Sequence, residues 1–269
     1  MNAYYFLRHK RMDDIINVRG LSSGILCTVI FIFYCSTQAS AQDKFLSIIV
    51  SPDIRVIRIS EHSYVHVSYT EVPGFGRVGS NGFIYANAGE SLLFDTPMND
   101  SLTGQLIDWI RDSLHLRIVG FIPNHWHNDC MGGLDCVARH GIPSYASEMT
   151  RTIAREKELP VPQHGFADSL VLHLGERVVF CRYEGPAHSP DNIVAWFPSE
   201  KILFGGCMVK ELQSATLGNT ADANLSEWPN TIKKVLEDFP AAELIIPGHG
   251  AFGGRELLTH TLDLLSHRK

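Results

Sequence analysis

The feature that most constrains this chain is a His-x-His-x-Asp pattern at positions 125–129, directly after an apolar segment at 116–121. Side chains two residues apart in an extended segment point the same way, so His125 and His127 can bind one metal ion. Asp129 continues that face, and a turn into a following helix can direct it to a second ion. Potential ligands at the end of a strand are typical of functional loops on a rigid scaffold.

Three other short segments place potential metal ligands at the ends of expected strands. His188 lies in a turn between two strands, Cys207 follows a strand, and His249 stands between glycines after the last strand. Imidazole and thiolate ligands select zinc, whereas hard cations prefer oxygen ligands. Six ligands are too many for one tetrahedral zinc, but they suit two catalytic sites with three protein ligands each. The sequence therefore predicts two zinc ions per chain.

The expected elements are strands followed by helices, twice over. Apolar residues at helical spacing predict an amphipathic helix over 101–114 and helices that contain Trp228 and Leu257. A further helix is expected to open at 131–133, and a mobile hairpin loop at 71–79. Strands are expected at 54–60, 62–69, 82–87, 91–94, 116–121, 170–174, 178–183, 193–197, 202–204 and 243–246. Two such halves predict an α/β sandwich, with two sheets packed together and helices outside.

The first 41 residues are typical of a secretory signal peptide. Basic residues precede an apolar run at 24–35, and Ala39-Ser40-Ala41 is a small-x-small cleavage site. An uncleaved membrane anchor is the alternative, but the run is only about a dozen residues, too short to span a bilayer comfortably. We expect cleavage after Ala41, export to the periplasm, no stable membrane association afterwards, and a single domain over 42–269.

Charge and cysteine content narrow the possible partners and cross-links. The formal net charge of -6 argues against binding to nucleic-acid phosphates. Cleavage would leave four cysteines, namely Cys130, Cys136, Cys181 and Cys207. An oxidising compartment permits disulfides, but the irregular spacing favours a metal-bound thiolate for at least one of them.

These motifs resemble the subclass B1 metallo-β-lactamases of the metallo-β-lactamase superfamily, from about Ser63 to the last helix. The His-x-His-x-Asp pattern alone is typical of the whole superfamily. Cys207 followed three residues later by Lys210 is typical of subclass B1, whereas thioesterases of the superfamily have a bridging Asp in place of the Cys. The Leu-Gly-Asn sequence at 217–219 resembles the Asn loop of that subclass. The resemblance implies a four-layer αβ/βα sandwich of two pseudo-equivalent halves.

The resemblance also implies a role for each residue of the motifs. Zinc ligands would be His125, His127 and His188 for the first ion, and Asp129, Cys207 and His249 for the second. Lys210 would pair with the carboxylate of a β-lactam substrate, and Asn219 would polarise the lactam carbonyl. A flap at 71–79 would place Phe75 over the substrate. Asp95 would be the carboxylate beneath the metals.

The implied reaction is hydrolysis of the lactam amide bond of penicillins, cephalosporins and carbapenems by a zinc-bound hydroxide, in a monomer. Asp129, Lys210 and Asn219 would be the catalytic residues, and no covalent acyl-enzyme would form. Water on zinc has a pKa of about 7, so no protein base is needed. The alternatives are another hydrolase of the superfamily, such as a thioesterase or lactonase, and a zinc-binding protein without catalysis. Cys207 and Lys210 argue against the first, and the division into three and three ligands argues against the second.

Cys130 departs from the subclass pattern, in which the position after the Asp of the motif is most often Arg. The substitution removes a positive charge beside Asp129. We hypothesise that the Cys130 thiol competes as a metal ligand or is oxidised, because thiolates near metals are reactive. The alternative is a buried, small apolar filler.

Overall fold

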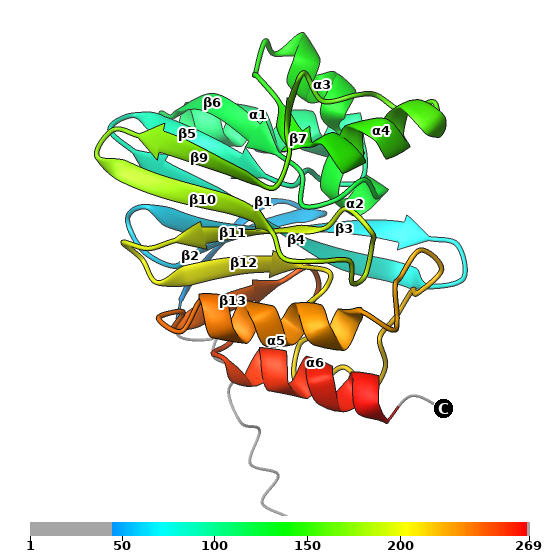
Figure 1. Ribbon diagram of the computed structural model, residues 1–269. Coiled ribbons are helices and arrows are strands. Elements are labelled where there is room, and N and C mark those ends of the chain that lie inside the picture. The colour runs from blue at the N-terminus through cyan, green and yellow to red at the C-terminus, as the bar shows by residue number, and fades with distance from the viewer. Residues whose placement is uncertain (1–44, 268–269) are drawn as a thin grey trace, which may run out of the picture. The chain divides into compact units, whose positions relative to one another are not determined.

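The computed structural model describes residues 45–267, so the expected signal peptide lies outside the described residues. Two main sheets stack face to face, with helices on the outer side of each (Figure 1). The first sheet has the strand order β1-β2-β3-β4-β5-β6, and the second has the order β13-β12-β11-β10-β9. This arrangement agrees with the predicted α/β sandwich.

Most strands of both sheets are antiparallel to their neighbours; the pairs β5–β6 and β12–β13 are parallel. The first sheet consists of β1 (Leu46–Ser51), β2 (Ile54–Arg58), β3 (Ser63–Val72), β4 (Gly76–Asn87), β5 (Glu90–Phe94) and β6 (Arg117–Ile122). The second consists of β9 (Ser169–Leu174), β10 (Arg177–Tyr183), β11 (Ile193–Phe197), β12 (Ile202–Gly206) and β13 (Leu244–Pro247). A small parallel pair is formed by β7 (Tyr145–Ser147) and β8 (His164–Phe166).

The helices divide between the two outer layers. They are α1 (Asp100–Ser113), α2 (Asn128–Met131), α3 (Leu134–Arg139), α4 (Glu148–Glu156), α5 (Trp228–Asp238) and α6 (Glu256–Ser266). The α1 helix begins after Asn99, whose side chain accepts a hydrogen bond from the Leu102 amide at 2.9 Å and so caps a free N–H group. Its buried side, with Leu106 and Ile110, faces the first sheet.

Three apolar clusters separate the four layers. Between the sheets, aromatic rings from both interlock, with the centroids of Phe83 and Phe197 4.7 Å apart. A second cluster joins the first sheet to α1 and α3, and includes Leu106. A third joins the second sheet to α5 and α6, and includes Ile232 and Leu258. Burial of these side chains is the main force that holds the layers together.

The predicted hairpin loop at 71–79 is shorter in the structure. Strand pairing continues to Val72 and Gly76, which are opposite one another, and the turn between them contains Phe75. The Phe75 amide donates to the Val72 carbonyl at 2.9 Å. Glycines at 74, 76 and 79 favour a loop, but Gly76 and Gly79 are paired with residues of β3 and belong to β4.

The prediction of a helix opening at 131–133 was wrong. The α2 helix begins at Asn128 and ends at Met131, and α3 begins only at Leu134. A Cβ atom on Gly133 would lie 1.9 Å from the Thr103 hydroxyl oxygen. The backbone at this point packs directly on α1, and that close approach requires glycine where the helix was expected.

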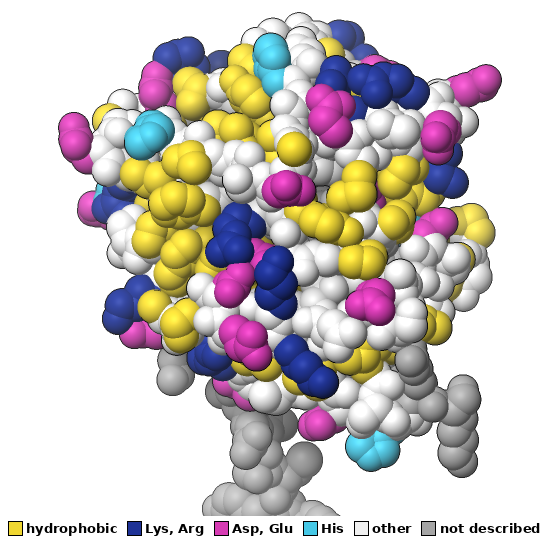
Figure 2. All heavy atoms as spheres, in the orientation of Figure 1, with side chains coloured by type: hydrophobic (Ala, Val, Ile, Leu, Met, Phe, Trp, Pro, Cys, Tyr) yellow, Lys and Arg dark blue, Asp and Glu magenta, His cyan; other side chains and the backbone are white. Residues whose placement is uncertain are grey.

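Figure 2 shows one face of the molecule, on which acidic and basic side chains are interspersed with hydrophobic ones. All four cysteines within residues 45–267 are free and buried. In the same part of the chain, no helix has the length and hydropathy to cross a membrane.

Candidate metal centre

The six predicted metal ligands come together at one end of the two sheets. The carboxyl ends of β6, β12 and β13 carry five of them, and the turn between β10 and β11 carries His188. These loops lie at the right-hand side of Figure 1, where the β3–β4 hairpin also projects. Residues from distant parts of the sequence therefore meet because strands of both sheets end at this edge.

The first group consists of three imidazoles whose nitrogens converge. His127 Nδ1 lies 2.9 Å from His125 Nε2 and 3.3 Å from His188 Nε2. Two nitrogens bound to one tetrahedral zinc at ordinary bond lengths lie about 3.3 Å apart. Burial lowers the pKa of His125 to about 3 and also lowers that of His188. Both rings are therefore neutral, the form in which imidazole binds metal.

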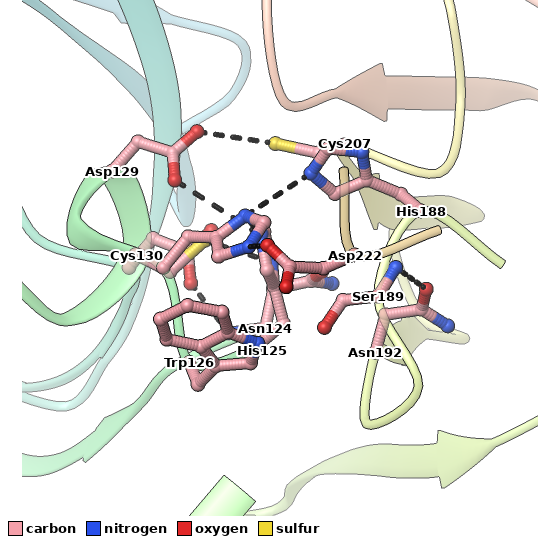
Figure 3. Close-up of polar contacts among 12 residues, drawn as sticks. Asn124, His125, Trp126, Asp129, Cys130, His188, Ser189, Asn192, Cys207 and Asp222 are labelled. Atoms are coloured by element: carbon pink, nitrogen blue, oxygen red, sulfur yellow. Dashed lines mark hydrogen bonds and ion pairs between the residues drawn. The ribbon is translucent and has the colours of Figure 1, made fainter. Parts of the chain in front are cut away.

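The second group brings together a thiol, a carboxylate and an imidazole. Cys207 Sγ lies 3.3 Å from Asp129 Oδ2 and 3.4 Å from His249 Nε2, and the latter two atoms are 3.1 Å apart. Figure 3 shows the Asp129 carboxylate directed at the Cys207 sulfur. A hydrogen bond from Cys130 lowers the pKa of Cys207 to about 6, against the effect of burial. This hydrogen bond therefore favours the thiolate, the form of cysteine that binds a metal.

The donor atoms of both groups fit zinc. Three nitrogens in one group, and one sulfur, one oxygen and one nitrogen in the other, are ligand types that zinc accepts. The separations in the second group are near the roughly 3.3–3.6 Å expected around one tetrahedral zinc with sulfur, nitrogen and oxygen ligands. Each group could thus hold one ion with an open coordination position.

Asp222 supports the first group, and sequence reasoning missed it. Its Oδ2 atom lies 3.0 Å from His127 Nε2. A proton held between these two atoms leaves Nδ1 of His127 free to face His125 and His188, so the carboxylate fixes the tautomer that a metal needs. The only signal in the sequence was an acidic residue in the loop that carries Asn219.

Asp191 connects the loops that carry the first group, and no role had been assigned to it. Its Oδ2 accepts hydrogen bonds from the Trp126 amide at 3.0 Å and the Thr150 hydroxyl at 2.7 Å. Its other oxygen accepts from the Ser189 hydroxyl. One buried carboxylate therefore joins the 125–129 segment, the His188 turn and the first turn of α4.

Asp95 lies close to three residues of the candidate site, because Cys130, Cys207 and Asp129 all act on its carboxyl group. Its Oδ1 accepts a hydrogen bond from the Asn124 amide at 2.5 Å, next to His125 in the chain. Its φ of 57° is in the left-handed region, which a non-glycine residue adopts at a cost of about 1–3 kcal/mol. Burial raises the pKa of Asp95 well above its usual range.

Cys130 contacts both groups from behind. Its Sγ atom lies 3.1 Å from His125 Nδ1, the ring nitrogen that faces away from His127. The ligand atoms of Cys130, Cys207, Asp129 and His125 all lie within 4.8 Å of one another. Cys130 is buried, and burial raises the pKa of its thiol. The side chain is thus buried, as the filler interpretation expects, but it also makes polar contacts.

Four of the candidate metal ligands line a cavity of about 600 Å³, namely His127, Asp129, His188 and His249. The flap side is apolar and includes Val72, Val78 and Phe75, the last of which is 67% exposed. Lys210 and Asn219 contribute to the lining as well. Seven of the nine residues of the predicted site therefore line this cavity, and the other two, His125 and Cys207, are buried against lining residues.

Lys210 and Asn219 differ in how firmly they are held. Lys210 is only 8% exposed, and no carboxylate within residues 45–267 forms an ion pair with it. Burial lowers the pKa of its ammonium group. Asn219 is exposed, and its Oδ1 accepts a hydrogen bond from the Ala221 amide at 3.1 Å. That bond forms a local turn, and Nδ2 is the atom that would donate to an oxyanion.

Comparisons with known proteins agree with this fold. A sequence profile of the metallo-β-lactamase superfamily matches residues 75–249. A metallo-β-lactamase type 2 from Bacteroides fragilis is 48% identical over 220 residues, which is 82% of this chain and 88% of the relative. One from Pseudomonas aeruginosa is 33% identical over 88% of this chain and 90% of its own. The solved metallo-β-lactamase from Pontibacter korlensis superposes with a TM-score of 0.78 at 37% identity, covering 80% of this chain and all of its own.

Fold and site together define a metal-binding α/β sandwich protein. The chain belongs to the metallo-β-lactamase superfamily. Its similarity to type 2 enzymes over most of their length confirms the predicted resemblance to subclass B1 and the predicted fold class.

Proposed function

We propose that this chain is a β-lactamase that hydrolyses the lactam amide bond of penicillins, cephalosporins and carbapenems with two zinc ions. The observation that carries the proposal is one cavity at which two trios of candidate metal ligands lie beside a buried lysine that forms no ion pair with a carboxylate among the described residues. A thioesterase or lactonase would not need that lysine. The curated relatives are named as β-lactamases, which supports the same reaction.

The proposed ligand sets are His125, His127 and His188 for one ion, and Asp129, Cys207 and His249 for the other. Zinc bound there would supply a nucleophile at neutral pH and polarise the carbonyl group under attack. The protein itself keeps the donor atoms converged. Asp222 Oδ2 holds the His127 ring in place through its Nε2 atom at 3.0 Å. The Gly79 carbonyl oxygen holds the His249 ring through its Nδ1 atom at 2.9 Å.

Two side chains would orient the substrate. The Lys210 ammonium would pair with the substrate carboxylate, which would give an ion-pair partner to a buried charge that has none among residues 45–267. Asn219 Nδ2 would donate to the carbonyl oxygen as negative charge develops on it. Phe75, at the tip of the hairpin, would cover the apolar part of the substrate. We further propose that the mature chain acts as a monomer in the periplasm, after removal of residues 1–41.

The test is hydrolysis of a carbapenem and a cephalosporin by the purified mature protein, with and without a chelator. We expect both substrates to be hydrolysed, activity to be lost with the chelator, and activity to return when zinc is added in excess. Activity that survives chelation, or no hydrolysis with zinc supplied, would overturn the proposal. A thioester and a lactone measured in parallel show whether another hydrolase activity is the main one.

Replacement of Cys130 by serine should weaken zinc binding and leave the number of bound ions at two. Cys130 contacts His125 and Cys207 from behind, and loss of such outer contacts commonly lowers metal affinity by roughly 10–100-fold. Zinc titration with a competing chelator measures both quantities. Loss of a whole equivalent would identify Cys130 as a direct ligand, and unchanged affinity would leave it as a filler.

A further inference from the structure

The indole of Trp228 makes three contacts near the cavity: with the Met208 carbonyl, and with His188 and Lys210, which both line the cavity. Trp228 is the first residue of α5 and is fully buried. Its Nε1–H group donates to the Met208 carbonyl at 2.9 Å, next to Cys207 in the chain. Its ring centroid lies 5.9 Å from that of His188. The ring therefore bridges the loop after β12 and the turn before β11.

The third contact is with Lys210. The Lys210 ammonium nitrogen lies 5.4 Å from the centroid of the Trp228 ring, within the range of a cation–π interaction. Trp is the aromatic side chain that attracts a cation most strongly. The backbone of Lys210 is held separately, because its amide donates to the Thr261 hydroxyl at 2.9 Å.

The contact matters because Asp129 and Cys207 act on the Lys210 ammonium only through longer-range attraction. The Lys210 side chain is buried, and no ion pair joins it to any acid among residues 45–267. A flexible four-carbon chain ending in an unpaired charge can adopt many rotamers. An aromatic face on one side limits those rotamers and leaves the other donor directions open for an anion.

We propose that Trp228 is a positioning residue that holds the Lys210 ammonium in place for the carboxylate of the substrate. This proposal rests on the proposed β-lactamase function, and it assigns recognition of the substrate carboxylate to Lys210 and Trp228 together. A role in core packing alone would explain the burial of Trp228. Core packing alone would not make the effect of a Trp228 substitution on KM depend on the charge of the substrate.

The experiment compares Trp228→Leu, Trp228→Phe and the wild type on a cephalosporin and on the methyl ester of the same compound. We expect Trp228→Leu to raise KM for the acid roughly 3- to 30-fold while kcat changes less. KM for the ester, which has no carboxylate, should stay within about twofold in the same comparison. Trp228→Phe keeps an aromatic face and should raise KM for the acid less than Trp228→Leu does.

Two controls make the test specific. Trp196 packs on Phe239 in the same outer core, with ring centroids 5.8 Å apart, and Trp196→Leu should leave KM for both compounds unchanged. In a Lys210→Ala background, Trp228→Leu should have no further effect on KM for the acid. If Trp228→Leu does not fold, Trp228→Phe is compared in both backgrounds in its place.

The inference is overturned if the acid and the ester lose affinity equally, or if the Trp228 effect persists without Lys210. It is also overturned if KM for the acid does not change in either variant. A wild-type protein that hydrolyses neither compound would instead contradict the proposed function, so the two failures are distinguishable.

Discussion

Replacement of Cys207 by serine is expected to remove one of two bound zinc ions and to lower kcat/KM by about 1,000-fold. Cys207 contributes the only sulfur to a trio whose other donors lie 3.3 and 3.4 Å from it. A hydroxyl is not deprotonated at neutral pH and is a poor ligand for zinc. A metal acting as a Lewis acid contributes several kcal/mol to the transition state, and each step of roughly 1.4 kcal/mol is tenfold in rate.

Bound zinc measured by elemental analysis and kcat/KM measured on the same preparation test this prediction. Cys136→Ser is the matched control, because Cys136 is also free and buried but belongs to the core between the first sheet and α3. That variant should keep both ions and its activity. Two tightly bound ions in Cys207→Ser, with activity near that of the wild type, would show that the thiolate does not hold a metal.

The Asp191→Ala variant is expected to be less stable by about 3 kcal/mol, because buried hydrogen bonds to a carboxylate contribute roughly 1.5–3 kcal/mol each. The change leaves the Trp126 amide and the Thr150 hydroxyl without their acceptor. For a chain of this size the melting temperature should fall by roughly 6–12 °C. The Trp126 amide lies between two metal ligands, so zinc affinity of the first site should fall as well.

Thermal unfolding of the metal-free protein measures the loss of stability without a contribution from zinc binding. Zinc titration measures the loss of affinity at the first site. Asp168→Ala is the control, since Asp168 is exposed and its side chain has no comparable contacts with the site. A melting temperature unchanged in Asp191→Ala would mean that the loops around the first site are held by other contacts.

The six proposed ligands could be found from the sequence because each stands close to a strand end. The 125–129 segment follows β6 within three residues, and Cys207 and His249 follow β12 and β13 at similarly short distances. A ligand that follows a predicted strand can be recognised without knowledge of the tertiary structure. Lys210, Asn219 and Phe75 were assigned only through the resemblance to the subclass B1 enzymes.

Asp222 and Asp191 could not be assigned in the same way. Asp222 contacts a histidine 95 residues earlier in the chain, and Asp191 contacts the amide of a residue 65 positions earlier. Carboxylates in polar loops are common, and only the fold brings these two against the ligands. The same holds for Gly133, which lies between α2 and α3 and whose backbone is so close to Thr103 that a Cβ atom would clash there.

Among the elements that were not predicted, β1 and α4 were missed for local reasons. The β1 strand presents Leu46 and Ile49 to solvent, 61% and 80% exposed, so its sequence shows no alternation of buried and exposed apolar residues. The α4 helix has few apolar residues and buries mainly Thr150 and Ala154. Ser147 caps α4 through the Thr150 amide at 3.0 Å, a local signal that the apolar pattern alone did not reveal.

We propose that this chain holds two zinc ions, one at each trio of ligands, and needs both to cleave a lactam. Metal-free protein should be titrated with zinc, with bound metal and carbapenem hydrolysis measured in the same samples. We predict that two equivalents bind per chain and that activity rises with them to a plateau. Hydrolysis at full rate without metal, saturation at one equivalent, or no hydrolysis with two equivalents bound would contradict the claim.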